Sequence, residues 1–245
     1  AGQMTFENGG PAGLPHAAGA IGIDLDSIEL DTRGLPYTWQ ASLVPPAPYD
    51  ASQPLGPVGL PEHIEINFGA TEAQGAECAE PVIYIIPVEA YKQMWEANGD
   101  PSISYTMDHV EALMADRPLP IPPFGLPVLP YEELDGVNDL AAQGSYPQSA
   151  TLSGVRFVGR FAQSPSPVTN EGLRYIFQGF SSDGRYFIAF FYPVSTNKLP
   201  QSITKVPAEE HEQVASDLET YLQDKVEMLN GLAPAAWSPD LDTLD

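Results

Sequence analysis

Hydrophobic and polar positions alternate with a period of two in several parts of the chain, as is typical of half-buried β-strands. This pattern predicts strands in "AIGIDLDSIEL" (20–30) and "LPYTWQASLV" (35–44), which we expect to pair with each other. Two further strands are predicted in "HIEINFGA" (63–70) and "PVIYIIPV" (81–88). The sequence therefore predicts that sheet structure begins near residue 19.

The strongest strand pattern lies between residues 151 and 194. "TLSGVRFVGRFAQ" (151–163) is followed by two aromatic runs, 173–180 and 186–194, separated by Ser181-Ser182-Asp183-Gly184. Both faces of each run are mostly apolar, which predicts a hairpin at the centre of the sheet, covered on both sides. The polar patch is predicted to be a tight turn, with Gly184 at a position of positive φ. The alternating acids of a calcium loop are absent from it.

The apolar period changes to that of a helix in three segments. Short and medium helices are predicted in "VEAYKQMWEANG" (88–99) and "DPSISYTMDHVEALMADRP" (100–118), and a long one covers 207–231. The apolar stripe of the second segment consists of Ile103, Met107, Val110 and Met114. The fold class expected is therefore α+β, with a mainly antiparallel sheet packed against two or three helices.

Proline is concentrated in two segments, 45–63 and 117–134. Because proline lacks a backbone donor, we expect both to cross the sheet as extended straps outside its hydrogen-bonded ladders. We expect residues 1–18 to form an irregular N-terminal arm, residues 19–237 a single α+β domain, and residues 238–245 a C-terminal tail that could begin another helix.

The two strongest β segments carry a motif pair. "GVRFVGRFAQ" (154–163) and "LRYIFQGFSSDGRYFIAFFYPVSTNKLP" (173–200) resemble the GVRY…YAQ and FQGLT-DG-YY motifs of a family of uncharacterised exported bacterial proteins, many of them predicted lipoproteins. The resemblance covers about residues 62–237 and departs at Phe180-Ser181, where the family has Leu-Thr. It implies export and an intact fold but transfers no site. The hairpin is also similar in layout to the PsbP/Mog1-type fold.

Charge and composition narrow the classes of function. The chain has 33 acidic and 10 basic residues, a net charge of −23 and a pI near 4.2. This charge repels phosphate backbones and anionic lipids, and no run approaches the roughly 20 apolar residues of a bilayer span. We therefore expect neither nucleic-acid binding nor direct membrane insertion. The single Cys78 excludes an internal disulfide, and the start at Ala1 suggests a secreted or cell-surface protein whose signal peptide was removed.

Two groups of side chains are candidate sites. Asp24 and Asp26 would share a face of the first predicted strand, where they either bind a cation such as Ca²⁺ or are simply solvated. A second group lies on the strongest β segments and contains four arginines, Arg156, Arg160, Arg174 and Arg185. Together they could bind a carboxylate or the acidic side chain of a partner, or each could pair with an acid of its own chain.

No catalytic or cofactor motif is present. The four histidines lack zinc-site spacing, and neither a nucleophile elbow nor a nucleotide-binding glycine loop occurs. We expect no cofactor, apart from the possible Ca²⁺. The preferred function is that of an extracytoplasmic, non-enzymatic accessory or binding protein with a protein partner or cell-surface component. The alternatives are a carboxylate-dependent hydrolase acting on polysaccharide or peptide, and a cation-dependent adhesive protein.

Overall fold

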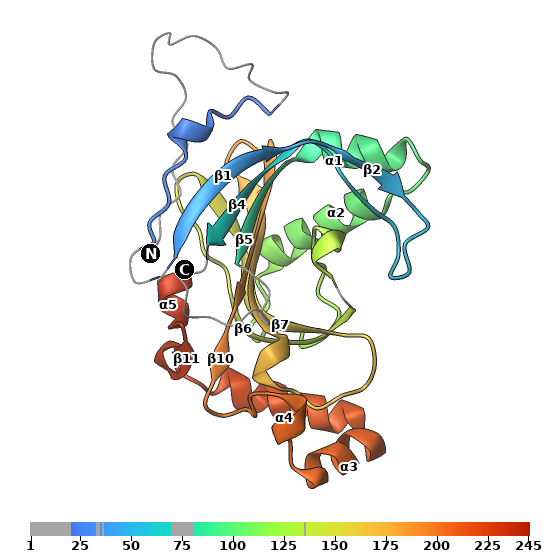
Figure 1. The fold of residues 1–245 in the computed structure, drawn as a ribbon, viewed down its shortest axis with the longest axis vertical. Helices are drawn as coiled ribbons and strands as arrows, with labels where there is room; N and C mark the ends of the chain where they lie inside the picture. The colour runs from blue at the N-terminus through green and yellow to red at the C-terminus, as the bar shows by residue number, and fades with distance from the viewer. Residues whose placement is uncertain (1–20, 33–34, 36, 70–80, 135) are drawn as a thin grey trace.

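The computed structural model describes residues 21–32, 35, 37–69, 81–134 and 136–245 of the 245-residue chain. The arm predicted for residues 1–18, together with Cys78, lies outside these ranges. The described part is built around a seven-stranded, fully antiparallel sheet (Figure 1). In spatial order its strands are β1 (Thr38–Val44), β4 (His63–Gly69), β5 (Val82–Pro87), β9 (Tyr186–Pro193), β8 (Leu173–Ser181), β7 (Leu152–Ala162) and β6 (Val137–Ser145).

The predicted hairpin is confirmed at the centre of this sheet. Strands β8 and β9 are nearly buried throughout, and their alternate residues enter two separate hydrophobic cores, one on each face. The connection is a turn: the Gly184 amide donates to the Ser181 carbonyl at 2.8 Å, and Gly184 has φ +69°. Asp183 accepts hydrogen bonds from the Ser181 hydroxyl and the Arg185 amide, so the polar patch holds its own backbone.

One face of the sheet is covered by α1 (Val88–Glu96) and α2 (Ser102–Asp116), as predicted (Figure 1). Residues 118–130 cross the same core without joining a strand, and Ile121, Leu126, Val128 and Leu129 are buried in it. The fully buried Gln178 of β8 fixes this strap: its Oε1 accepts from the Leu129 amide at 2.7 Å, and its Nε2 donates to the Pro127 carbonyl at 2.6 Å. The second strap prediction is therefore confirmed as far as packing over the core is concerned. The strap also binds β6, however, since the Ala141 amide donates to the Pro123 carbonyl at 2.7 Å and the Gly125 amide to the Asn138 carbonyl at 3.2 Å.

The opposite face is covered by α4 (Leu218–Asn230) and α5 (Leu241–Leu244), with α3 (Ala208–Ser216) beside α4. The single helix predicted over 207–231 is therefore wrong. Asp217 interrupts it with φ −154° and ψ 81°, and its side chain caps α4 by accepting from the Thr220 amide at 3.1 Å. A capping aspartate competes with the helical conformation because its carboxylate satisfies amides that a continuous helix would bond internally.

Two predictions for the first third of the chain are also wrong. Residues 20–30 contain the 3₁₀ turn η1 (Leu25–Ser27) instead of a strand, and β1 pairs with β4. The Asp24 side chain accepts from the Asp26 amide at 3.1 Å, which favours the turn over an extended strand. The first proline-rich segment does form a ladder, the small hairpin of β2 (Ala47–Asp50) and β3 (Val58–Leu60).

Short elements complete the fold. They are η2 (Tyr131–Glu133), η3 (Asn170–Gly172), η4 (Ile203–Lys205), η5 (Pro234–Ala236), β10 (Ser195–Thr196) and β11 (Trp237–Ser238), of which the last two pair with each other.

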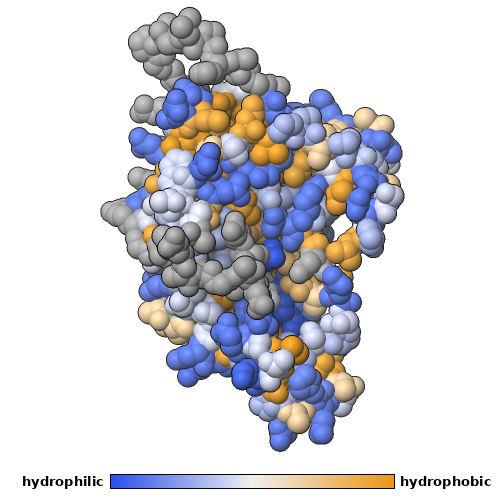
Figure 2. Space-filling view, in the orientation of Figure 1, coloured by the Kyte–Doolittle hydropathy of each residue, from blue (hydrophilic) through white to orange (hydrophobic). Residues whose placement is uncertain are grey.

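None of the helices in the described part of the chain is both long and apolar enough to cross a bilayer. Figure 2 shows a largely hydrophilic visible surface, with apolar residues gathered near the top around η1.

Candidate functional site

A cavity of about 250 Å³ lies on the α5 face of the sheet. Strands β4, β5, β8 and β9 form its floor, and residues 30–32, Leu35, the 147–149 loop and α5 border it. The residues that line it are Leu30, Asp31, Thr32, Leu35, Phe68, Ile83, Pro147, Gln148, Ser149, Leu152, Tyr175, Phe177, Ile188, Phe190, Thr243, Leu244 and Asp245. It is a mainly apolar site with a few polar groups at its border, as small-molecule sites usually are.

Strand alternation directs every second residue of the floor strands to this face, and several of these residues are aromatic. Phe177 and Phe190 are directly opposite each other in the β8–β9 register. The Phe190 ring lies 6.0 Å from that of Phe68 and 5.6 Å from that of Tyr175, between ring centroids. These contacts fix the ring orientations, so the cavity has a preformed apolar surface.

One border of the cavity carries a buried ion pair. The Arg156 side chain donates from Nε to Asp245 Oδ1 and from Nη2 to Asp245 Oδ2, both at 2.8 Å. Tyr175 donates its hydroxyl to the same Oδ1 at 2.9 Å, and Arg156 also reaches the Gln143 carbonyl. Burial, with the Asp245 charge as a second cause, raises the pKa of Tyr175, so this hydroxyl stays protonated as a donor.

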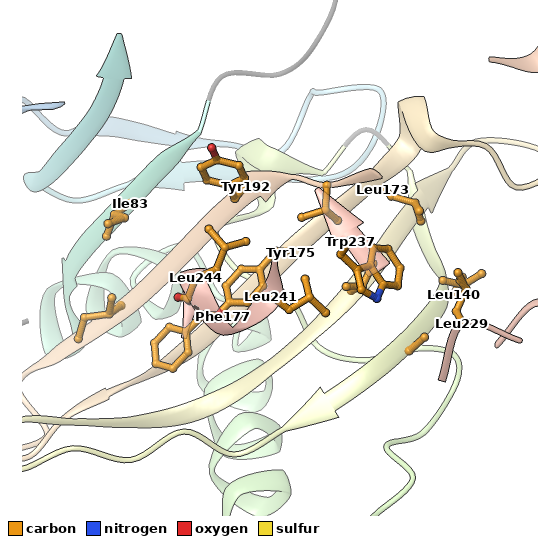
Figure 3. Close-up of a cluster of buried hydrophobic side chains, with 14 of the residues drawn as sticks. Ile83, Leu140, Leu173, Tyr175, Phe177, Tyr192, Leu229, Trp237, Leu241 and Leu244 are labelled. Carbon is orange, nitrogen blue, oxygen red and sulfur yellow. Dashed lines mark hydrogen bonds between the residues drawn. The ribbon is translucent and has the colours of Figure 1, made fainter. Parts of the chain in front are cut away.

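The C-terminal residues that complete the site belong to the core. Leu241 is fully buried and Leu244 nearly so, and Figure 3 shows both beside Tyr175 and Phe177. Asp240 starts α5 by accepting from the Asp242 amide at 3.0 Å. Sequence reasoning treated 238–245 as a tail and did not find this part of the site. The helical spacing of Leu241 and Leu244 after a capping aspartate was the available signal.

The four arginines of the predicted patch lie in different places. Arg156 and Arg160 share the α5 face of β7, Arg174 lies on the opposite face of β8, and Arg185 follows the exposed turn. Each forms an ion pair within the chain, with Asp245, Asp139, Glu133 and Asp183, respectively. This is the internal pairing that the sequence left open as the alternative to a binding patch.

The predicted cation site has a different geometry from the one expected. Asp24 and Asp26 belong to a 3₁₀ turn, so they do not share a strand face. Within the described ranges, no group of three or more His, Cys, Asp or Glu residues could hold a metal ion. The buried His63 faces the Pro61 carbonyl at 2.8 Å and the Glu65 carboxylate at 3.0 Å.

Two glutamates of η2, directly after the strap, form a second group of ionisable side chains. They bind groups on the face of the sheet that α1 and α2 cover. Glu132 Oε1 accepts from the Gly59 amide at 2.6 Å, while the remainder of the Glu132 side chain is exposed. Glu133 accepts from the Tyr84 hydroxyl at 2.6 Å and from Arg174 at 3.2 Å. Desolvation is the largest cause of the raised pKa of Glu132. Both carboxylates therefore accept hydrogen bonds from donors of the protein itself.

The chain has no match among known proteins in any of three comparisons. No family model matches it, and neither a curated protein nor a solved structure matches it. The resemblance to exported bacterial proteins and the similarity to the PsbP/Mog1-type layout therefore stay predictions, and the cavity must be interpreted from its own chemistry.

Proposed function

We propose that this protein is an extracytoplasmic, non-enzymatic binding protein that holds a small apolar ligand in the cavity beneath α5. The observation that carries the proposal is the apolar floor of this cavity, to which four adjacent strands contribute and whose aromatic rings come from β4, β8 and β9. A folded core normally fills such a space with side chains, since interiors are close-packed. An apolar cavity bordered by a few polar groups is the usual form of a ligand site.

The volume and the rigidity of the site support a small ligand. About 250 Å³ is close to the lower end of the 300–1,000 Å³ typical of small-molecule pockets. The floor strands are central in the sheet, and paired strands hold their side chains in fixed positions. A ligand would therefore find a site that is already formed, which lowers the entropy cost of binding.

The location and the partner remain part of the proposal. A secreted or cell-surface position and a protein or cell-surface partner are supported by the acidic composition, since strong net charge keeps a protein soluble and selects against anionic surfaces. In this arrangement the cavity would take the small ligand, and the acidic exterior would meet the partner.

The test is saturable binding of a neutral, environment-sensitive dye such as N-phenylnaphthylamine, followed by fluorescence. Leu152→Trp should fill the cavity and weaken binding about tenfold or more, because Leu152 lines it and is only half-buried. The matched control is Leu218→Trp, at a half-buried leucine on the same core that is outside the lining. Absence of saturable binding, or equal loss in both variants, would reject the proposal.

A carboxylate-dependent hydrolase is the second candidate, and one observation favours it. Glu132 has a raised pKa and is next to Glu133, and a raised pKa is what a general acid requires. Its expected signature is slow hydrolysis of a polysaccharide or peptide that disappears in Glu132→Gln. Activity unchanged by Glu132→Gln would exclude this residue as the general acid.

A further inference from the structure

The charged groups around the cavity distinguish between classes of apolar ligand. Asp31 and Asp245 line it, and lysine, arginine and histidine are absent from its described lining. The other polar side chains of the lining, Thr32, Gln148, Ser149, Tyr175 and Thr243, are neutral. A ligand that brings its own negative charge into this space would lose hydration without meeting a free cation.

Two arginines contact lining residues without being part of the lining: Arg156 pairs with Asp245, and the exposed Arg117 donates to Gln148 Oε1 at 3.0 Å. Arg156 is only 6% exposed and donates two hydrogen bonds to Asp245 and one to the Gln143 carbonyl. It lies behind Asp245 and is not part of the lining. The carboxylate of Asp245 therefore occupies the place that an anionic head group would need.

Asp245 has acceptor capacity left for a ligand. Its Oδ1 receives the Arg156 Nε and the Tyr175 hydroxyl, while its Oδ2 receives, among the residues that the structure describes, only the Arg156 Nη2. A carboxylate offers about four acceptor positions, so roughly one remains, on Oδ2. The Asp245 side chain is 25% exposed and lines the cavity, so a donor inside the cavity can reach it.

We propose, resting on the proposed function, that the ligand has an apolar body and a hydrogen-bond-donating head, a hydroxyl or an amine, and that carboxylates of the same shape are rejected. The head donates to Asp245 Oδ2, and the body lies on Phe177 and Phe190. Specificity comes mainly from the penalty for a second carboxylate beside Asp245, because like charges at short range in a desolvated site repel strongly. The net charge of −23 acts in the same direction at low salt.

The experiment uses three probes that share one body: naphthalenemethanol, naphthalenemethylamine and naphthoic acid, substituted at the same ring carbon. Each is titrated against the bound dye at neutral pH, in low and in high salt. We expect the alcohol and the amine to displace the dye, and the acid to be weaker by about tenfold or more in both salts. Equal binding of all three, or tightest binding of the acid, would overturn the inference.

Asp245→Ala gives a second, opposite expectation. Removing the carboxylate leaves the Arg156 guanidinium without its counter-ion, so naphthoic acid should now bind more tightly than the alcohol and raise the melting temperature of the variant. The control is Asp242→Ala, at an exposed position of the same helix, which should keep the wild-type order of affinities. A variant that keeps rejecting the acid contradicts the inference.

The outcomes separate the two proposals. If neither the dye nor any probe binds the wild-type protein, the proposed function itself fails. If the probes bind without a preference for the donor heads, the cavity is a ligand site and only the inference about ligand class fails. The wild-type series decides the matter by itself if Asp245→Ala does not fold.

Discussion

The ion pair between Arg156 and Asp245 should make the stability of the sheet depend on the last turn of the chain. Asp245→Ala leaves the guanidinium of Arg156, a residue only 6% exposed, without its counter-ion, and an uncompensated buried charge costs about 3 to 5 kcal/mol. Arg156→Met should cost less, about 1 to 2 kcal/mol, because the Asp245 side chain is 25% exposed and can be solvated, while methionine keeps the apolar stem packed.

The double variant provides the decisive measurement. With methionine at position 156, Asp245→Ala no longer strands a charge, so the double variant should be about as stable as Arg156→Met alone. The free energies come from urea unfolding followed by tryptophan fluorescence and circular dichroism, with unchanged m-values as the check for two-state behaviour. A cost below about 1 kcal/mol for Asp245→Ala, or additive costs in the double variant, would refute the assignment of a coupled buried pair.

Three further predictions concern the fold that carries the site. Gln178→Leu should lower the free energy of unfolding by about 2 to 5 kcal/mol, because it leaves two backbone groups of the strap without partners. Its control is Gln213→Leu, at an exposed position, which should change this free energy by less than about 0.5 kcal/mol. Gly179→Ala should lower the free energy of unfolding by about 2 kcal/mol or more, since its Cβ would come within 2.1 Å of a backbone oxygen of β7. Its control is Gly231→Ala, whose Cβ would meet its nearest atom at 3.4 Å and which should be nearly neutral in the same denaturation assay. Hydrogen bonds from Ser181 and then Arg185 lower the pKa of Asp183 from 3.8 to about 2, so the small stabilisation by this exposed carboxylate is complete above pH 3.8 and is lost as the pH falls toward 2. An NMR titration midpoint near 3.8 for Asp183 would contradict this last prediction, and equal losses in either matched pair would contradict the first two.

The local sequence pattern was sufficient to predict a helix or a strand where one strong periodicity extended over many residues. The runs that became β8 and β9 are apolar on both faces, and only a central, doubly covered strand satisfies such a pattern. Helices α1 and α2 were predicted because their apolar stripes face a single core. Predictions failed where a local polar contact competed with the pattern, at Asp24 and at Asp217, whose carboxylates bind nearby backbone amides.

The candidate site was not predicted because its parts are distant in the sequence. The aromatic floor combines residues from strands on either side of β9, and its polar border joins Arg156 to Asp245, 89 residues apart. The aromatic runs that became β8 and β9 were expected in a sheet covered on both sides, but no periodicity shows that a core is incompletely filled. Packing defects are properties of the assembled interior, where volumes from different elements must match.

The sequence by itself determined the fold class, the central hairpin with its turn and the packing of the second proline-rich segment over the core, because these depend on the periodicity within one segment. The acidic balance of the chain is likewise a property of composition. Only the tertiary structure decided which acid each arginine meets, that residues 241–245 belong to the core, and where a cavity remains. These depend on contacts between distant segments, and the same local sequence is compatible with many such contacts until the whole chain has packed.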